Sequence, residues 1–316
     1  MASMSFFNYL GYKILATILR GLYILLQIVM GRNNRRMVQE LDVRWEHIQL
    51  PSRDKGRCIK ANLYYPSEYL TSPTNKARPI IISWHGSGWF NYAWGYDAYY
   101  CARVARETGM FVLDADYRKG PETTFPGPYH DVEDVLRWIA SQPGRFDLNR
   151  VAVSGFSAGG TLALIAASAL RKTLTQIQIP IVIAFYPPTD LSIPAEARTV
   201  PRPIKAFPVF ILNFFLDCCA PDKAMRTDLR ISPGLASPAD FPPNVIIITC
   251  EGDNLSPEAI KLAEKLDDGK RRLVHEHLKA TFHGYDLVPQ PGSYEWGLRE
   301  KTYGLVTDTL KEVLMQ

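Results

Sequence analysis

The chain has 316 residues, of which 47% are apolar and 22% are charged, proportions that fit a globular protein with a sizeable core. The net charge is +4 and the basic residues are scattered, which argues against nucleic acid as a partner. Five cysteines without CxxC spacing argue against both a disulfide framework and a zinc site. No linker-like or repetitive tract divides the sequence, so we expect one domain with insertions.

The N-terminal residues 5–30 form an apolar segment with few polar interruptions. Two charges inside this segment disfavour a bilayer-spanning helix, and the lack of a clear small-residue cleavage site disfavours a signal peptide. We expect residues 1–42 to form a helical cap over the active site or a helix on a membrane surface, touching it through residues 5–36; a signal anchor is the third alternative. The polar interruptions share one helical stripe and are Lys13, Thr17, Arg20 and Gln27.

From residue 43 onward, apolar strand-like runs alternate with helix-like segments. Such alternation predicts right-handed crossovers and a mostly parallel sheet that binds its ligand at the carboxyl ends of the strands. The alternation stops between residues 192 and 241, where proline and bulky apolar residues are frequent, and we interpret this stretch as an insert. The expected strands cover residues 43–50, 59–65, 80–84, 111–115, 151–154, 181–186, 245–250 and 273–278. The expected helices cover residues 96–107, 130–141, 161–170, 256–267 and 294–314, and residues 66–79 are expected to form a loop.

The segment around Ser157 carries the first chemical signal. Gly155 to Gly159 fit the pattern G-x-S-x-G, and they lie between a short apolar strand and an alanine- and leucine-rich helix. Small residues let the backbone turn sharply and leave the serine exposed at the apex, above a helix N-terminus that favours negative charge. This context predicts a nucleophile; the alternative is a glycine-rich turn with an incidental serine.

A serine hydroxyl becomes a nucleophile when a base takes its proton and a carboxylate orients that base. Asp253 follows the seventh expected strand and His283 follows the eighth, so both should lie at the same sheet edge as Ser157. The chain order Ser157, Asp253, His283 is that of α/β-hydrolases. Weaker candidates for the acid are Glu251 and Asp286, and weaker candidates for the base are His47, His130, His275 and His277.

Acyl transfer also needs donors aimed at the oxygen that becomes negatively charged. The backbone N–H of Ala158, directly after the nucleophile, is one candidate. The loop after strand 80–84 supplies two others, which we assign to Ser87 and Gly88. His85 and Gly86 complete this small-residue loop and are expected to support it.

These motifs together resemble the hormone-sensitive-lipase-like branch of the α/β-hydrolases, which includes arylacetamide deacetylases, bacterial esterases and plant carboxylesterases. The resemblance implies an α/β-hydrolase fold: a mostly parallel, eight-stranded sheet flanked by helices in residues 43–316. It also implies a helical cap, built from the N-terminal helices and residues 192–241, and no metal or organic cofactor. The matching motifs are HGSG at 85–88, DYRKGPE at 116–122, GFSAGG at 155–160, GDNLSPE at 252–258 and HGY at 283–285.

Three residues or pairs depart from the family pattern: Ser87 replaces a glycine, Phe156 an aspartate, and Ser256-Pro257 a charged pair. No departure removes a member of the expected triad. Phe156 and the apolar insert favour an apolar or aromatic substrate.

We therefore predict a serine carboxylic-ester hydrolase that acts on a small apolar or aromatic ester through an acyl-enzyme. One alternative excludes water from the same site and carries out acyl transfer, condensation or cyclisation in a small-molecule pathway. Another alternative is a non-catalytic small-molecule receptor. A glycan on the sequon Asn254-Leu255-Ser256 would obstruct the site, which favours an intracellular protein, cytoplasmic or peripherally membrane-associated. The sequence indicates no oligomeric state.

Overall fold

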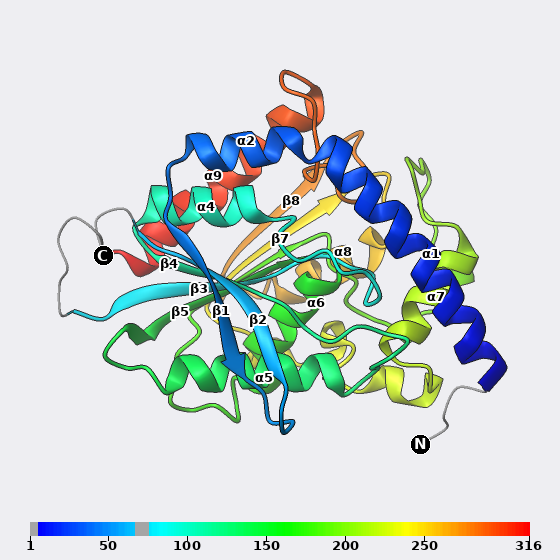
Figure 1. Ribbon diagram of the computed structural model, residues 1–316, viewed down its shortest axis with the longest axis horizontal. Coiled ribbons are helices and arrows are strands. Elements are labelled where there is room, and N and C mark those ends of the chain that lie inside the picture. The colour runs from blue at the N-terminus through cyan, green and yellow to red at the C-terminus, as the bar shows by residue number, and fades with distance from the viewer. Residues whose placement is uncertain (1–5, 67–75) are drawn as a thin grey trace.

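The computed structural model describes residues 6–66 and 76–316. Within them, eight strands form one sheet in the order β1-β2-β4-β3-β5-β6-β7-β8 (Figure 1). Strand β2 runs antiparallel to both of its neighbours, and every pair from β4 to β8 is parallel, which confirms the predicted sheet. The strands are β1 (Trp45–Pro51), β2 (Cys58–Tyr64), β3 (Arg78–Trp84), β4 (Phe111–Ala115), β5 (Phe146–Phe156), β6 (Ile181–Phe185), β7 (Asn244–Cys250) and β8 (Arg272–Leu278).

Helices cover both faces of the sheet. Helices α4 and α9 pack on one face, and α5, α6 and α8 pack on the other (Figure 1). The helices are α1 (Phe6–Met30), α2 (Arg32–Glu40), α4 (Ala98–Thr108), α5 (Gly127–Ala140), α6 (Ala158–Ile165), α7 (Val209–Cys219), α8 (Ser256–Leu266) and α9 (Tyr294–Leu314). Among the described residues, no helix is long and apolar enough to cross a membrane.

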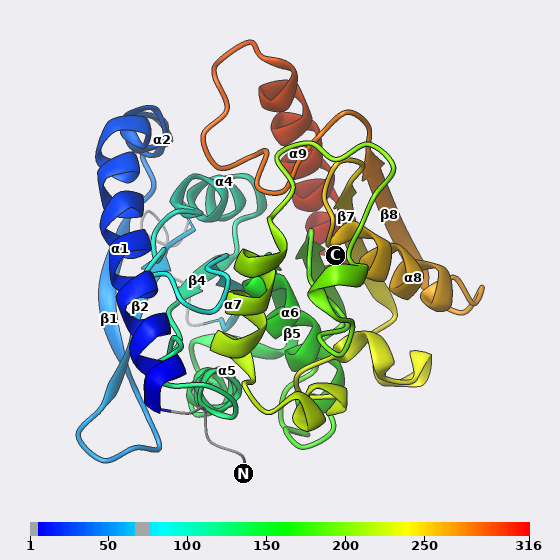
Figure 2. The ribbon, with the colours of Figure 1, turned by 90° about the vertical axis from the view of Figure 1, so that its right-hand side faces the viewer.

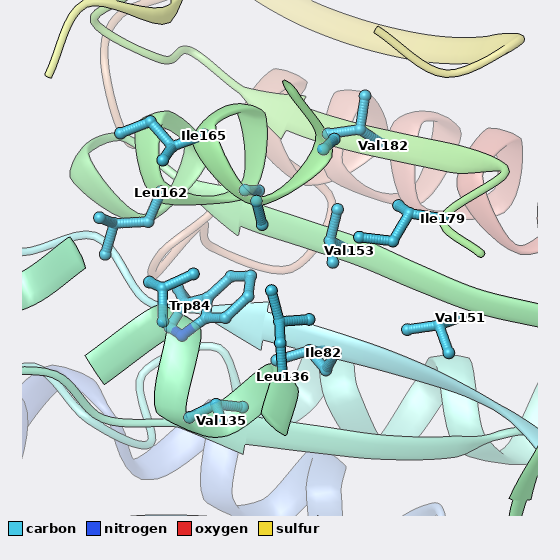
Figure 3. Packing of buried hydrophobic residues seen from close by; sticks show 14 of the residues in the cluster. Ile82, Trp84, Val135, Leu136, Val151, Val153, Leu162, Ile165, Ile179 and Val182 are labelled. Atoms are coloured by element: carbon cyan, nitrogen blue, oxygen red, sulfur yellow. The ribbon is translucent and has the colours of Figure 1, made fainter. Parts of the chain in front are cut away.

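The central strands are buried on both faces, which explains why their sequences are continuously apolar rather than alternating. In β3, Ile80 and Ile82 point to the face covered by α5 and α6, whereas Ile81 points to the face covered by α4 and α9. Figure 3 shows Ile82 and Trp84 packed among side chains of α5 and α6. The resulting double-sided core holds the carboxyl ends of the strands, and the loops that follow them, in fixed positions.

Several element boundaries differ from those expected. Strand β5 begins at Phe146, five residues earlier than expected: the apolar Phe146 and Leu148 pack on the core, and the polar residues between them and Val151 conceal the start. Helix α5 begins at Gly127, a start that the glycine and Pro128 conceal. Helix α6 gives way to one π-helical turn at Ala166–Leu170. Within the expected loop 66–79, residues 67–75 lie outside the described residues, and the last two belong to β3.

Helix α1 and the insert share an apolar cluster that is separate from the two sheet cores. Ala16 of α1 and Leu212 and Phe214 of α7 belong to it. Figure 2 shows α1 running along the edge of the molecule, next to α7. The expected polar stripe of α1 is divided: Arg20 is buried, Lys13 and Thr17 are exposed, and the side chain of Gln27 lies outside the described part.

Candidate active site

The turn from β5 to α6 places Ser157 at its apex. Ser157 has φ +52° and ψ −121°, in a region that non-glycine residues rarely occupy and that marks a constrained turn. The glycines are needed because the backbones are in contact: a Cβ at Gly155 would lie 2.2 Å from the Gly159 oxygen, and a Cβ at Gly159 would lie 1.9 Å from the Trp84 oxygen. The apex thus projects the Ser157 hydroxyl beyond the sheet edge.

The structure brings the three residues of the predicted triad together. His283 Nε2 lies 2.8 Å from Ser157 Oγ, and His283 Nδ1 lies 2.7 Å from Asp253 Oδ2. Asp253 is 1% exposed, and its second oxygen accepts a hydrogen bond from the Leu255 N–H at 2.9 Å. This chain of contacts is the arrangement in which a histidine takes the serine proton while a carboxylate fixes the orientation of the ring.

The loops that carry Asp253 and His283 are bonded to each other. The N–H of Glu251 donates to the Leu278 oxygen at 2.9 Å, and the N–H of Gly252 donates to the Thr281 oxygen at 2.8 Å. Glu251, a weaker candidate for the acid, instead accepts from the N–H of Ala280 at 2.9 Å. These bonds hold the two loops at a fixed separation.

The other candidates for the acid and the base have different partners. Asp286 accepts from the hydroxyls of Tyr186 at 2.6 Å and Tyr303 at 2.8 Å, and its burial raises its pKa. It thereby fixes Tyr186, whose ring lies 4.6 Å from the His283 ring. His275 and His277 both contact Thr249 Oγ1 at 2.9 Å on β7. His130 lies in the first turn of α5, and the ring of His47 on β1 lies 5.1 Å from that of Trp94.

The loop from His85 to Gly88 passes in front of the serine. A Cβ at Gly86 would lie 3.2 Å from the Ser157 Cβ, and Gly88 has φ +54°. Within residues 6–66 and 76–316, the N–H groups of Ser87 and Gly88 donate to no protein acceptor. The N–H of Ala158 belongs to the first turn of α6, where backbone donors lack intrahelical acceptors. These three donors are available to a negatively charged oxygen.

The hydroxyl of Ser87, which replaces the family's glycine, is used inside the loop. It accepts from the N–H of Trp89 at 3.0 Å and lies 2.7 Å from Tyr117 Oη. Tyr117 Oη donates to the His85 oxygen at 2.7 Å, so the serine hydroxyl donates to the tyrosine. The departure from the family pattern therefore adds two hydrogen bonds to the loop and leaves its backbone donors in place.

An ion pair lies beneath the loop. Lys119 Nζ lies 2.7 Å from Asp116 Oδ1, which also contacts His85 Nε2 at 3.2 Å. Burial opposes ionisation of Asp116, but the charge of Lys119 and the hydrogen bond with His85 outweigh it and lower the pKa of Asp116. Burial lowers the pKa of Lys119 to about 8, against the opposing effect of Asp116. The pair anchors the buried ring of His85, which stacks on Tyr117.

Aromatic side chains of the insert cover the site. The Phe207 ring lies 5.0 Å from the His283 ring, and the Phe215 ring lies 5.3 Å from that of Phe207. A Cβ at Gly88 would lie 2.8 Å from the Phe215 ring, so this ring borders the space in front of the candidate donors. The His283 side chain is 10% exposed beneath this cover.

Phe156, in contrast, does not line the site, and its expected influence on the substrate is wrong. Its side chain is 2% exposed and stacks on Phe185 at 4.5 Å, within the core beneath α4 and α9. The residue before the nucleophile points to the opposite side of the turn, because alternate strand residues face opposite faces of the sheet.

Sequence reasoning gave no role to Tyr117, Lys119, Phe207 or Phe215. The first two lie in the DYRKGPE motif. Because this motif directly follows β4, it lies at the edge of the sheet where the parallel strands end, which is also the edge of the candidate site. The two phenylalanines belong to an insert without periodic pattern, and no signal in the sequence singles them out. Within the described residues, no cluster of three His, Cys, Asp or Glu side chains could hold a metal ion.

Residues 81–287 match a protein family described as alpha/beta hydrolase fold. The chain belongs to this family. Esterase LipI of Mycobacterium tuberculosis is 29% identical over 240 residues, which span 72% of this chain and 71% of that protein. Arylacetamide deacetylase of Oryctolagus cuniculus is 26% identical over 265 residues, which span 63% of this chain and 66% of that protein.

A solved esterase of Pyrobaculum calidifontis superimposes with a TM-score of 0.76 at 22% identity, covering 94% of this chain and 92% of that one. The fold is therefore that of the α/β-hydrolases, and the relatives place the chain in the hormone-sensitive-lipase-like branch. The protein is a carboxylic ester hydrolase.

Proposed function

We propose that Ser157, His283 and Asp253 hydrolyse the ester in two steps. Ser157 Oγ attacks the carbonyl carbon as His283 Nε2 takes its proton, and Asp253 stabilises the imidazolium. The intermediate expels the alcohol, which receives the proton from His283. A water molecule, activated by the same nitrogen, then releases the acid from the acyl-enzyme. The observation that carries this proposal is the chain of 2.8 Å and 2.7 Å contacts from hydroxyl to imidazole to carboxylate.

We assign the stabilisation of the oxyanion to the N–H groups of Ser87, Gly88 and Ala158. Among the described residues, the N–H groups of Ser87 and Gly88 have no protein acceptor, and this, with the short distance from Gly86 to the serine, supports the assignment. Each donor of this kind contributes about 2.7–4 kcal/mol to transition-state stabilisation. His85 is a positioning residue, because its ring is buried, stacks on Tyr117, and contacts Asp116 and the Gly86 oxygen through its two nitrogens.

The substrate that fits this site is a small ester with a short apolar or aromatic group. Phe215 borders Gly88, and Phe207 contacts the ring of His283, so the walls near the reacting carbonyl are apolar. We attribute the cover to a cap made of residues 1–42 and 192–241 on a hydrolase domain of residues 43–316. The apolar cluster that α1 shares with α7 supports this division.

Replacement of Ser157 by alanine tests the nucleophile. Ser157→Ala should abolish hydrolysis of 4-nitrophenyl acetate and labelling by a fluorophosphonate probe, while the urea midpoint stays within experimental error. Ser168→Ala is the matched control, because its hydroxyl is bonded to the Leu164 oxygen inside a helix and should leave both readouts unchanged. Labelling of the wild type would exclude the non-catalytic receptor, and full activity of Ser157→Ala would contradict the assignment.

A second function, acyl transfer, condensation or cyclisation at the same site, is favoured by one feature. Phe207 and Tyr186 both contact the ring of His283 and limit the access of water to the base. If this cover excludes water during turnover, an added alcohol should yield a transfer ester in preference to the free acid. Chromatography of the products with and without a primary alcohol distinguishes transfer from hydrolysis.

A further inference from the structure

Helix α1 carries a continuous apolar row on its outward side. Six of its members follow one another at intervals of 3, 4, 4, 7 and 3 residues, the spacing of one helical face. Their side chains are between 44% and 82% exposed. Figures 1 and 2 show the helix along the outer edge of the molecule. The six are Phe7, Leu10, Ile14, Ile18, Leu25 and Ile28.

Polar contacts on the inner side of α1 fix this orientation. The Tyr12 hydroxyl donates to Asp217 at 2.5 Å, and the Arg20 guanidinium binds Glu122 through two bonds of 2.8 Å and 2.9 Å. The Tyr23 ring stacks on that of Tyr96 at 4.8 Å. Turning the apolar row inward would break all three contacts and leave the Glu122 carboxylate without this partner. The helix is therefore held with its apolar face toward the outside.

Basic residues border the row. Lys13 lies on the flank of α1, and Arg32, Arg35 and Arg36 follow at its C-terminal end on α2; all four are exposed. Arg36 pairs with the exposed Glu40 at 2.8 Å, so the excess positive charge comes mainly from Lys13, Arg32 and Arg35. A second copy of the chain would present the same excess of positive charge and the same apolar row, so it offers little charge complementarity. A lipid surface offers apolar chains to the row and anionic headgroups to the basic residues.

We propose that the outward face of α1 binds the surface of an anionic lipid bilayer. The helix would lie in the plane of the interface, its apolar row below the headgroups and its basic residues among them. This proposal is independent of the catalytic assignment, because none of these side chains belongs to the candidate active site.

Vesicle flotation of the full chain tests the proposal. The vesicles are phosphatidylcholine alone or phosphatidylcholine with phosphatidylserine. The wild type should float with the anionic vesicles, and Ile14→Glu/Ile18→Glu should lower the bound fraction at least tenfold. The matched control is Leu229→Glu/Leu235→Glu, which adds the same charge at two other exposed leucines and should float like the wild type. Hydrolysis of 4-nitrophenyl acetate should be unchanged in both variants, which shows that they are folded.

Two further measurements test the role of the basic residues and the oligomeric state. Lys13→Gln/Arg32→Gln/Arg36→Gln should weaken binding to the anionic vesicles and remove the preference for them over neutral ones. The proposal is overturned if the wild type floats with neither vesicle, or if Ile14→Glu/Ile18→Glu floats as well as the control. It is also overturned if light scattering shows a dimer that this variant dissociates and that does not bind vesicles, because the row would then be an interface between two copies.

Discussion

Tyr117→Phe should slow the reaction without touching the substrate. The Tyr117 hydroxyl donates to the His85 oxygen and accepts from Ser87, each at 2.7 Å, and the residue is 2% exposed. Phenylalanine keeps the ring that stacks on His85 at 4.9 Å, so the change removes two hydrogen bonds and little packing. The loop of residues 85–88 would then lose the link that joins its first and third residues to the segment after β4.

The magnitude follows from the groups left unpaired. A buried donor or acceptor without a partner costs about 1–3 kcal/mol, and the change leaves two such groups unpaired, so the free energy of unfolding should fall by about 2–6 kcal/mol. Complete loss of one oxyanion donor costs about 2.7–4 kcal/mol in the barrier. Because the backbone donors remain and only shift, kcat should fall about 10- to 100-fold, equivalent to about 1.4–2.7 kcal/mol.

Urea unfolding followed by tryptophan fluorescence measures the first effect, and steady-state hydrolysis of 4-nitrophenyl acetate measures the second. Ser87→Ala is the comparison variant: it removes the bonds to Tyr117 and to the Trp89 N–H but keeps the Tyr117 bond to the His85 oxygen. The loss of stability should therefore be similar and the loss in kcat smaller. A Tyr117→Phe variant that is destabilised as expected but has kcat within twofold of the wild type would refute the reasoning, because the loop would then hold its donors unaided.

Three further outcomes are expected. Phe215→Ala should raise kcat/KM for longer acyl esters relative to acetate by about fourfold per added methylene, since each buried methylene contributes about 0.8 kcal/mol; an unchanged ratio across 4-nitrophenyl esters would show that this ring does not limit the acyl group. Arg20→Met should free α1, because the guanidinium also donates to the Phe90 oxygen at 2.8 Å and the Gly120 oxygen at 2.9 Å; faster hydrogen exchange in residues 6–30 measures this, and unchanged exchange would contradict it. Burial, with added repulsion from neighbouring positive charge, lowers the pKa of His275 and His277, so below about pH 6.5 the unfolded chain binds more protons and the free energy of unfolding should fall as pH decreases. Urea midpoints at pH 7 and 5.5 should therefore differ less in His275→Gln/His277→Gln than in the wild type.

The sheet and the proximity of Ser157, Asp253 and His283 could be predicted because the apolar runs and motifs that indicate them are local. The apolar runs of β3, β5 and β7 are buried on both faces of the sheet, so each strand can be predicted from its own sequence. Parallel strands end at one edge, and this rule alone brings the loops of Ser157, Asp253 and His283 together. The order of the parallel strands is therefore enough to predict that these three residues lie close together.

The groups that surround the triad could not be predicted in the same way. Tyr117 reaches the loop of His85 from the segment that follows β4, a strand that pairs with β3 but is distant from it in sequence. Phe156 was expected to influence the substrate. Because side chains alternate between the two faces along β5, Phe156 points into the core instead and stacks on Phe185. Phe207 reaches His283 through an insert whose path follows no periodic pattern. The contacts of Tyr117 and Phe207 join segments that carry no mutual signal, whereas the burial of Phe156 follows from the alternation of side chains along β5.

The orientation of α1 is set by a few polar contacts with distant residues and not by the distribution of apolar residues along the helix. Burial of apolar area would favour the opposite rotation of this helix, with Ile14 and Ile18 inward. Arg20 opposes that rotation because its partners, Phe90 and Glu122, lie 70 and 102 residues away and accept its hydrogen bonds beneath the helix. The opposite rotation would carry the guanidinium away and leave the Glu122 carboxylate and the Phe90 oxygen without this donor, and acceptors left without a partner cost free energy. Phe90 in turn stacks on Phe215 at 5.6 Å. The residue that accepts a hydrogen bond from Arg20 therefore also supports the aromatic wall of the candidate active site.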